Sequence, residues 1–205
     1  MKNFENLIWL FTSSYRNRGL LRLDLDEAVY IYKLIKELDY NTTYKLFCVE
    51  IGRLFGGSTI LMAAAGGTVL SIDNLSAKSI KGSKKYDIAL KKILKEMELE
   101  DNVVIEVADS STYDTQYYNE SQIGRVSVLL IDGDHTYKGV KKDYENWFPV
   151  VREGGHILFH DSCATREEAT ARPEVEKFVR EIESTLIMKK QIGSLTHFEK
   201  YTGDK

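Results

Sequence analysis

The sequence predicts an α/β protein, a three-layer sandwich built on a Rossmann-like, mostly parallel sheet of seven strands with an antiparallel last strand. Several short apolar runs lack polar alternation, which is typical of strands that are buried on both faces. A segment with helical periodicity follows most of these runs, and this favours parallel strands joined by crossover helices. The last two apolar runs are separated by a short turn around Gly193, which favours an antiparallel pair.

The first two elements are expected to be helices. Asn6–Phe11 has the composition of a short apolar helix. Asp24 and Glu27 have the spacing of a capping box, in which each side chain accepts a hydrogen bond from the other residue's backbone N–H. An apolar stripe with helical spacing continues from there to Leu38.

After Leu38 the sequence alternates between strands and helices. Strands are expected over Lys45–Ile51, Thr68–Ile72, Val103–Val107, Val126–Ile131, His156–Phe159, Leu186–Gln191 and Leu195–Tyr201. Helices are expected over Ser58–Ala65, Tyr86–Leu99, Tyr137–Val151 and Glu174–Leu186.

Composition excludes several classes of protein. Of the 205 residues, 43% are hydrophobic and 29% are charged, which is enough apolar material for a core. A net charge of −3 gives no reason to expect a nucleic acid or membrane partner. No apolar run approaches the roughly 20 residues of a membrane span, and no secretory signal is recognisable, so we expect a cytoplasmic protein. Cys48 and Cys163 are too few for a disulfide framework.

Ligands of open parallel sheets bind at the carboxyl ends of the strands, so the residues there are the candidates for function. The turn after the first strand combines an acidic residue with glycines and a helix-starting serine: Glu50, Gly52, Gly56, Gly57 and Ser58. Leu54 stands where a dinucleotide-binding fingerprint requires glycine, and the Gly-Lys of a P-loop is missing. An acidic residue here would repel a pyrophosphate and suits a ligand with a positive centre.

Acidic residues also follow the next strands. Asp73 comes 21 residues after Gly52, a position typical of a carboxylate that binds ribose hydroxyls. Asp109 and Ser110 follow the third strand and suit the edge of an adenine. The fourth and fifth strands end in the densest polar groups, Asp132-Gly133-Asp134-His135 and His160-Asp161-Ser162. Each residue alone could cap a helix, but together they indicate one site.

From about Lys45 to its end, the chain resembles class I S-adenosylmethionine-dependent methyltransferases, specifically the small group with an I-D-G-D-H-x-Y segment. The resemblance rests on Val49–Thr59, Asp73, Ile131–Tyr137 and Gly154–Asp161. It implies that S-adenosylmethionine is the cofactor. The methionine part of the cofactor would contact Glu50 and the backbone of Gly52–Ser58. The ribose would contact Asp73, and the adenine would contact Asp109 and Ser110. Asp132 would lie near the cofactor.

The resemblance leaves two versions of the chemistry open. In related metal-dependent O-methyltransferases the matching residues hold Mg²⁺, which implies Asp132 and Asp161 as ligands with His160 or Ser162 as the third. Without a metal, His135 or His160 would act as the general base on a hydroxyl. His156 and His197 lie within expected strands and are interpreted as structural.

The expected function is methyl transfer to a hydroxyl of a small molecule or sugar. One alternative is a metal-dependent glycosyltransferase that uses a nucleotide sugar, because Asp132-Gly133-Asp134 matches a D-x-D motif; the acidic Glu50 turn argues against its diphosphate ligand. A nicotinamide oxidoreductase is disfavoured by the glycine pattern, and a non-catalytic cofactor-binding protein is the last alternative.

Two domains of unequal role are expected. Residues 1–40 would form a helical extension that covers the substrate pocket or makes a homodimer contact. The cofactor site would not require this extension. Residues 41–205 would form the methyltransferase domain. Asn74–Tyr86 is a candidate lid, and the tyrosines of Thr112–Gln122 either form an aromatic wall for a substrate or pack under their loop.

Overall fold

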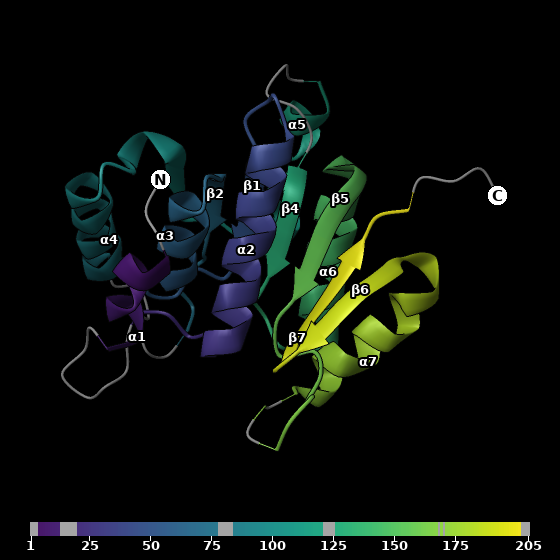
Figure 1. The fold of residues 1–205 in the computed structure, drawn as a ribbon. Helices are drawn as coiled ribbons and strands as arrows, with labels where there is room; N and C mark the ends of the chain where they lie inside the picture. Colours follow the sequence, from purple (N-terminus) through teal and green to yellow (C-terminus); the bar gives the residue numbers. More distant parts are fainter. Residues whose placement is uncertain are drawn as a thin grey trace.

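The computed structural model describes residues 4–12, 20–77, 84–120, 126–167, 169 and 171–201. Parts of the candidate lid Asn74–Tyr86 and of the segment Thr112–Gln122 lie outside the described residues. In the described part, seven strands form one sheet in the order β3-β2-β1-β4-β5-β7-β6 (Figure 1). These strands are β1 (Phe47–Ile51), β2 (Thr68–Ile72), β3 (Val103–Glu106), β4 (Val126–Ile131), β5 (Val151–Phe159), β6 (Ile187–Ile192) and β7 (Leu195–Glu199).

The strand pairing determines where a ligand can bind. Strands β1 to β5 pair in parallel, whereas β7 is antiparallel to both of its neighbours, β5 and β6. The chain runs outward from β1 to β3 and then returns to place β4 on the other side of β1. Open α/β sheets bind their ligands outside the carboxyl ends of the strands at such a reversal. The predicted fold class is confirmed.

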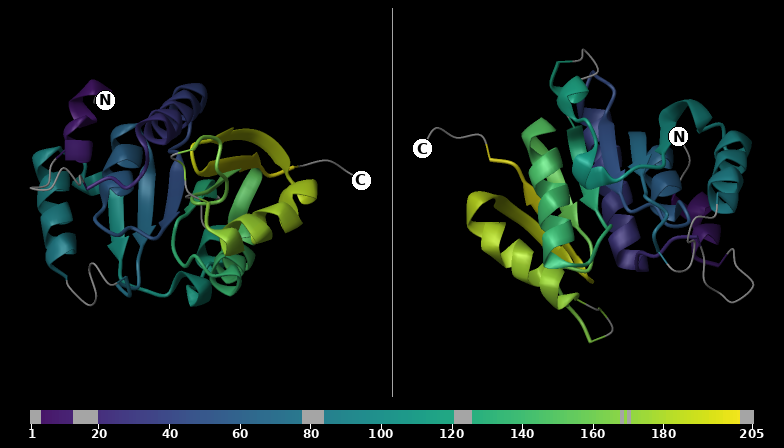
Figure 2. Two further views of the ribbon diagram at one scale, coloured as in Figure 1. Left: turned by 90° about the horizontal axis from the view of Figure 1, so that it is seen from below. Right: turned by 180° about the vertical axis from the view of Figure 1, so that it is seen from behind.

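Helices cover both faces of the sheet (Figure 2). The helices are α1 (Trp9–Thr12), α2 (Leu25–Asn41), α3 (Gly57–Ala64), α4 (Lys85–Glu96), α5 (Gln116–Glu120), α6 (Tyr137–Trp147) and α7 (Pro173–Ile182). In β4, Val128 and Leu130 pack with α1 to α4 on one face, and Leu129 and Ile131 pack with α6 and α7 on the other. None of the helices in the described ranges is long and apolar enough to cross a membrane.

Short 3₁₀ turns complete the chain: η1 (Phe4–Leu7), η2 (Glu100–Asn102), η3 (Ser110–Thr112), η4 (Phe148–Val150) and η5 (Glu183–Thr185). The largest difference from the predicted elements is at β5, which begins at Val151 and takes the last residue of the predicted helix. The pairing of β4 with β5 shifts register between Val126 and Val128, and Gly154 has a φ of +64°. Gly154 and Gly155, which we expected to precede the strand, therefore lie in an irregularity within it.

Helix α2 begins with the predicted capping box. Asp24 is the N-cap residue, and its backbone N–H donates to Glu27 Oε2 at 2.7 Å. The helix then buries Ala28, Ile31 and Ile35 against the sheet. Burying a large aliphatic side chain contributes about 1.5–3 kcal/mol. These contacts fix the start of α2 near the carboxyl edge of the sheet.

Candidate functional site

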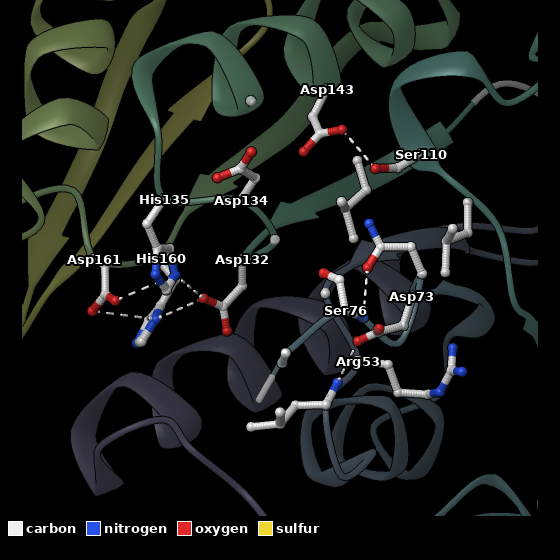
Figure 3. A pocket seen from close by; sticks show the side chains of 18 of the residues that line it. Arg53, Asp73, Ser76, Ser110, Asp132, Asp134, His135, Asp143, His160 and Asp161 are labelled. Carbon is white, nitrogen blue, oxygen red and sulfur yellow. Dashed lines mark hydrogen bonds and ion pairs between the residues drawn. The ribbon is translucent and has the colours of Figure 1, made fainter. Parts of the chain in front are cut away.

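A cavity of about 1230 Å³ opens outside the carboxyl ends of the strands (Figure 3). Its wall contains most of the residues singled out in the sequence: Gly52, Ser58, Asp73, Asp109, Ser110, Asp132, His135, His160 and Asp161. Leu20, Arg22 and Leu23 from the segment before α2 line it as well. Pockets for one small ligand commonly have roughly 300–1,000 Å³. This cavity is therefore larger than one small ligand commonly requires.

Glu50 lies beneath the turn after β1 and is fully buried. Its carboxylate accepts hydrogen bonds from the hydroxyls of Ser58, Thr59 and Ser71. Burial raises the pKa of Glu50, and these hydroxyl donors act in the opposite direction. We expected Glu50 to hold the methionine part of a cofactor. Its oxygens instead accept hydrogen bonds from the start of α3 and from β2, and so join these two elements. The residues of the turn, and not Glu50, therefore line the cavity.

The glycines of this turn allow close backbone packing. Gly52 has a φ of +91°, and a Cβ there would lie 2.0 Å from the carbonyl oxygen of Asp132. A Cβ on Gly57 would lie 2.4 Å from Cα of Leu21. Gly56, at the N-cap of α3, packs against the side chain of Leu90. We expected all three to approach a ligand, but only Gly52 lines the cavity, and Gly56 and Gly57 face other parts of the protein.

Asp73 is held at the end of β2 by two backbone donors. The N–H of Leu54 donates to its Oδ2 at 2.8 Å, and the N–H of Leu75 donates to its Oδ1 at 2.6 Å. Each carboxylate oxygen has a second acceptor site, and Asp73 lines the cavity. The side chain can therefore accept two further hydrogen bonds from neighbouring hydroxyls of a ligand.

Arg53 is a site residue that the sequence analysis did not identify. It is buried and pairs with Asp87 at 2.9 Å. Its Nη1 also donates to the carbonyl oxygens of Ser71 and Glu106, which belong to β2 and β3. Arg53 thus joins the turn after β1 to two neighbouring strands. An arginine inside a glycine-rich turn was the only local signal for this role.

Asp143 is a second residue that was missed. It is 4% exposed, lines the cavity and accepts a 2.6 Å hydrogen bond from Ser110 Oγ. Burial raises the pKa of Asp143 to about 6, although the Ser110 hydroxyl lowers it. The signal in the sequence was an acidic residue on the apolar face of α6, between Val140 and Trp147. Asp109 beside it accepts from the backbone N–H of Ser111 at 3.0 Å and caps η3.

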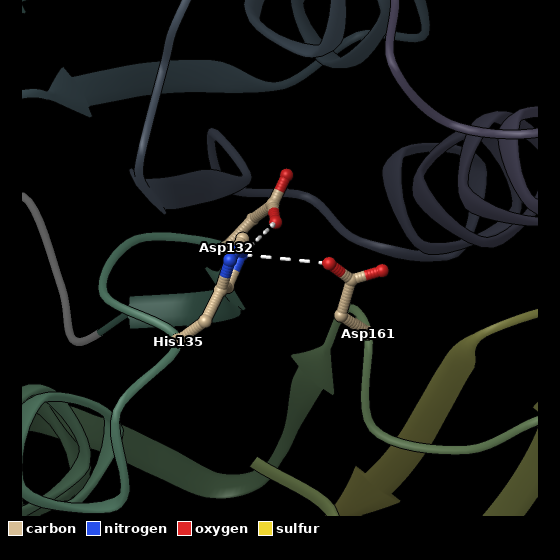
Figure 4. Close-up of side chains that lie close together, drawn as sticks. All are labelled: Asp132, His135 and Asp161. Carbon is tan, nitrogen blue, oxygen red and sulfur yellow. Dashed lines mark ion pairs between the residues drawn. The ribbon is translucent and has the colours of Figure 1, made fainter. Parts of the chain in front are cut away.

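Asp132, His135 and Asp161 converge at the other end of the cavity (Figure 4). Nε2 of His135 lies 3.6 Å from Asp132 Oδ1 and 3.5 Å from Asp161 Oδ2. The carboxylate of Asp132 beside the ring raises the pKa of His135. Burial by itself would raise the pKa of Asp132, but His160 and His135 lower it to about 2. Asp161 has a φ of +54°, and its Oδ2 lies 3.2 Å from Nε of Arg172.

His160 has protein partners on both ring nitrogens. Its Nδ1 lies 3.1 Å from Asp132 Oδ1, and its Nε2 lies 3.2 Å from Glu27 Oε2 and 3.1 Å from Ser194 Oγ. Burial opposes the charged ring, yet Asp132 and Glu27 raise the pKa of His160 well above its ordinary value. With both nitrogens occupied, His160 is poorly placed for the role of general base or metal ligand that we expected.

The donor set at this end of the cavity fits a divalent cation. One ligand atom from each of Asp132, His135 and Asp161 lies within 4.8 Å of the others. Two carboxylates and one imidazole suit cations such as Mn²⁺, whereas Mg²⁺ prefers oxygen ligands alone. His135, and not His160, is thus the histidine in this candidate donor set. The other alternative, Ser162, is buried and donates its hydroxyl to the carbonyl oxygen of Phe159 at 2.8 Å.

The remaining candidates are structural. Tyr118 stacks on Phe47 and Tyr113 on Trp147, with ring centroids 5.2 Å and 5.6 Å apart, so these tyrosines pack under their loop. His156 Nδ1 and His197 Nε2 lie 2.9 Å apart on adjacent strands, and the hydroxyl of Tyr30 lies 2.7 Å from the other nitrogen of His197. The structural interpretation of this histidine pair agrees with its burial.

Fold and sequence together define the class of protein. The sheet and its helical layers are those of Rossmann-like methyltransferases. A family model described as a methyltransferase domain matches residues 49–162, more than half of the chain. The chain therefore belongs to this family of methyltransferase domains, as the resemblance of Val49–Thr59 and Ile131–Tyr137 had indicated.

Solved structures similar to this chain include O-methyltransferases and rRNA methylases. An O-methyltransferase from Bacillus cereus in complex with SAH has a TM-score of 0.62 and 17% identity, over 98% of this chain and 92% of that chain. A TDP-rhamnose 3′-O-methyltransferase of calicheamicin biosynthesis has a TM-score of 0.63 and 15% identity, over 95% of this chain and 91% of that chain. At these identities the likeness concerns the fold.

Curated relatives match only short stretches. An uncharacterised protein of Acanthamoeba polyphaga mimivirus is 36% identical over 59 residues, 29% of this chain and 27% of that protein. An uncharacterised protein of Sinorhizobium fredii is 38% identical over 48 residues, 23% of this chain and 5% of that protein. The chain thus matches about a quarter of the first relative's length and a small part of the second.

Proposed function

We propose that this protein is a class I S-adenosylmethionine-dependent methyltransferase that methylates a hydroxyl oxygen of a small molecule or sugar. The observation that carries the proposal is the arrangement of one cavity. Carboxylates suited to an adenosine line one end, and the Asp132–His135–Asp161 cluster lines the other. Membership of a methyltransferase-domain family supports this assignment.

The cofactor end is assigned residue by residue. Asp73 accepts hydrogen bonds from the ribose hydroxyls, for which its oxygens keep free acceptor sites. Ser110 and Asp109 border the adenine, with Asp143 behind Ser110. The Gly52–Leu54 turn and Ser58, which line the cavity, face the methionine part. When bound, S-adenosylmethionine supplies the electrophilic methyl group.

The acceptor end is assigned to the cluster. Asp132, His135 and Asp161 would hold a divalent cation, and such an ion would supply the orientation of the acceptor hydroxyl and the lowering of its pKa. The metal-free alternative uses His135 as the general base. The cation is favoured because Nε2 of His135 faces a carboxylate oxygen of both Asp132 and Asp161, so that the three side chains can each offer one ligand atom to the same ion. Arg172 lies beside Asp161 and orients its carboxylate.

The geometry disfavours the glycosyltransferase alternative. A D-x-D motif requires both carboxylates to face one cation, but Asp134 Oδ1 accepts from the backbone N–H of Thr136 at 2.9 Å. In Figure 3 the carboxylates of Asp132 and Asp134 point in different directions. Asp134 thus stabilises the turn before α6, whereas Asp132 belongs to the proposed metal site. The two carboxylates of the D-x-D motif therefore have different roles.

Calorimetric titration of the full chain with S-adenosylhomocysteine, with and without Mg²⁺ or Mn²⁺, tests the proposal. We expect micromolar binding of S-adenosylhomocysteine and no binding of NAD or UDP-sugars. Binding of a UDP-sugar alone would favour the glycosyltransferase alternative. A protein that binds the cofactor and transfers no methyl group to any of a panel of sugars, sugar nucleotides and phenols would be a non-catalytic binding protein.

Two further points belong to the same proposal. The cavity wall includes Leu20, Arg22 and Leu23, which supports the role of residues 1–40 as a cover over the substrate pocket, with a homodimer contact as the second proposal. We also propose a small-molecule substrate and no nucleic acid or membrane partner, in keeping with a net charge of −3.

A further inference from the structure

A carboxylate of the N-terminal helix reaches the metal end of the cavity. Glu27 of α2 is fully buried, and its Oε2 lies 3.2 Å from Nε2 of His160. The same oxygen accepts the backbone N–H of Asp24, and Oε1 accepts the backbone N–H and the hydroxyl of Ser194 at 2.6 Å and 2.9 Å. A Cβ on Gly193 would lie 2.3 Å from Oε1. The turn between β6 and β7 therefore encloses this carboxylate, which cannot rotate freely.

His160 connects Glu27 to the cluster. On its other side, Nδ1 lies 3.1 Å from Asp132 Oδ1 and 3.6 Å from Asp161 Oδ1. The ring is 8% exposed, so water contributes little to its orientation. The fixed carboxylate of Glu27 thus orients the imidazole of His160, and this imidazole orients the carboxylate of Asp132 in the proposed metal site. Helix α2 and the turns that follow β5 and β4 each supply one member of this chain of contacts.

We propose that Glu27 and His160 are positioning residues that fix the carboxylate of Asp132 for cation binding. The inference rests on the proposed function, in which Asp132, His135 and Asp161 hold the cation. Glu27 and His160 touch neither substrate nor cation in this arrangement. His160 contacts Asp132 Oδ1, the oxygen that also faces His135, and Glu27 acts on Asp132 only through His160. Removal of such outer partners typically weakens metal affinity 10- to 100-fold. Through Glu27, the N-terminal segment thus supports the proposed metal site, although the sequence suggested that the cofactor site does not need it.

A purely structural role is the competing explanation, since Glu27 also joins α2 to the turn before β7. The two explanations differ in what a matched variant does. Ser194→Ala removes two hydrogen bonds from the same buried cluster, to Glu27 and to His160, but leaves the Glu27–His160 contact in place. Glu37→Gln removes one negative charge from the exposed side of the same helix.

The experiment is a titration of the full chain with Mn²⁺ in saturating S-adenosylhomocysteine, with free Mn²⁺ measured by electron paramagnetic resonance. We expect Glu27→Gln to weaken Mn²⁺ binding 10- to 100-fold and to change the affinity for S-adenosylhomocysteine less than threefold. Ser194→Ala and Glu37→Gln should bind Mn²⁺ within threefold of the wild type. His160→Gln should weaken Mn²⁺ binding as much as Glu27→Gln, and the double variant should lose no more than either single variant, because the two residues act in series.

Each outcome decides the question. Unchanged Mn²⁺ affinity in Glu27→Gln, or an equal loss in Ser194→Ala, would overturn the positioning role. A wild-type protein that binds S-adenosylhomocysteine but no Mn²⁺ would also overturn it, while the methyltransferase assignment would stand. A protein that binds Mn²⁺ with the expected variant effects but no S-adenosylhomocysteine would refute the proposed function alone. Should Glu27→Gln not fold, His160→Gln carries the test with the same expected loss, and wild-type affinity in that variant would overturn the role.

Discussion

Replacing Asp73 with alanine removes the carboxylate that we assign to the ribose. In the structure this side chain already accepts two backbone hydrogen bonds, from Leu54 and Leu75, and keeps one free acceptor site on each oxygen. A hydrogen bond to a charged group contributes about 1.5–3 kcal/mol, and each 1.4 kcal/mol is a factor of about ten in affinity. Loss of one of the two proposed ribose contacts alone therefore predicts at least tenfold, and up to roughly 150-fold, weaker binding of S-adenosylhomocysteine, and loss of both predicts a larger decrease.

The assay is calorimetric titration of wild type and Asp73→Ala with two ligands, S-adenosylhomocysteine and its 2′-deoxyribose analogue. If Asp73 binds the ribose, removing the hydroxyl and removing the carboxylate delete the same contact, so the two losses should not add. Asp109→Ala serves as a control, because its partner would be the adenine and its loss should add to that of the hydroxyl. An affinity of Asp73→Ala within threefold of the wild type, or fully additive losses for Asp73→Ala, would refute the ribose assignment.

Three further predictions concern the proposed metal ligand Asp161, the buried histidine pair, and Arg53 of the turn after β1. Asp161→Asn should abolish any Mg²⁺ or Mn²⁺ dependence of methyl transfer, and asparagine tolerates the left-handed φ of +54° as well as aspartate does. Full activity of the wild type in EDTA would contradict the metal assignment. Burial lowers the pKa of His156 to about 4 and that of His197 to about 3, so below pH 6.5 the unfolded chain takes up protons that the native pair does not. The pair's contribution to stability is therefore present above pH 6.5 and falls by about 1.4 kcal/mol per residue and pH unit as the pH decreases towards 4. Urea unfolding of wild type and His197→Gln at pH 7 and pH 5 measures this loss, and parallel pH dependences would contradict it. Arg53→Met leaves the buried carboxylate of Asp87 unpaired and should cost about 3–5 kcal/mol in urea unfolding; a loss below 1 kcal/mol would show that Asp87 finds another partner.

The expected elements agree closely with the structure where local pattern alone determines them. Thr68–Ile72 and Val126–Ile131 have the predicted bounds, because an apolar run between polar turns can form only a buried strand in this context. The capping box at Asp24 also follows from spacing alone. The beginning of β5 was missed, because the irregular pairing around Gly154 depends on the register with β4, which no local pattern specifies.

For the site, the sequence by itself determined which residues gather at the carboxyl edge of the sheet, since strand ends in a parallel sheet share one edge. Only the tertiary structure decided what each side chain faces. Glu50 points below the turn, His160 is enclosed between Asp132 and Glu27, and His135 takes the open position beside the carboxylates. Glu27 and His160 are 133 residues apart in the chain. Contacts over such distances arise from the packing of helix on sheet, and the hydrophobic periodicity that predicts each element carries no information about them.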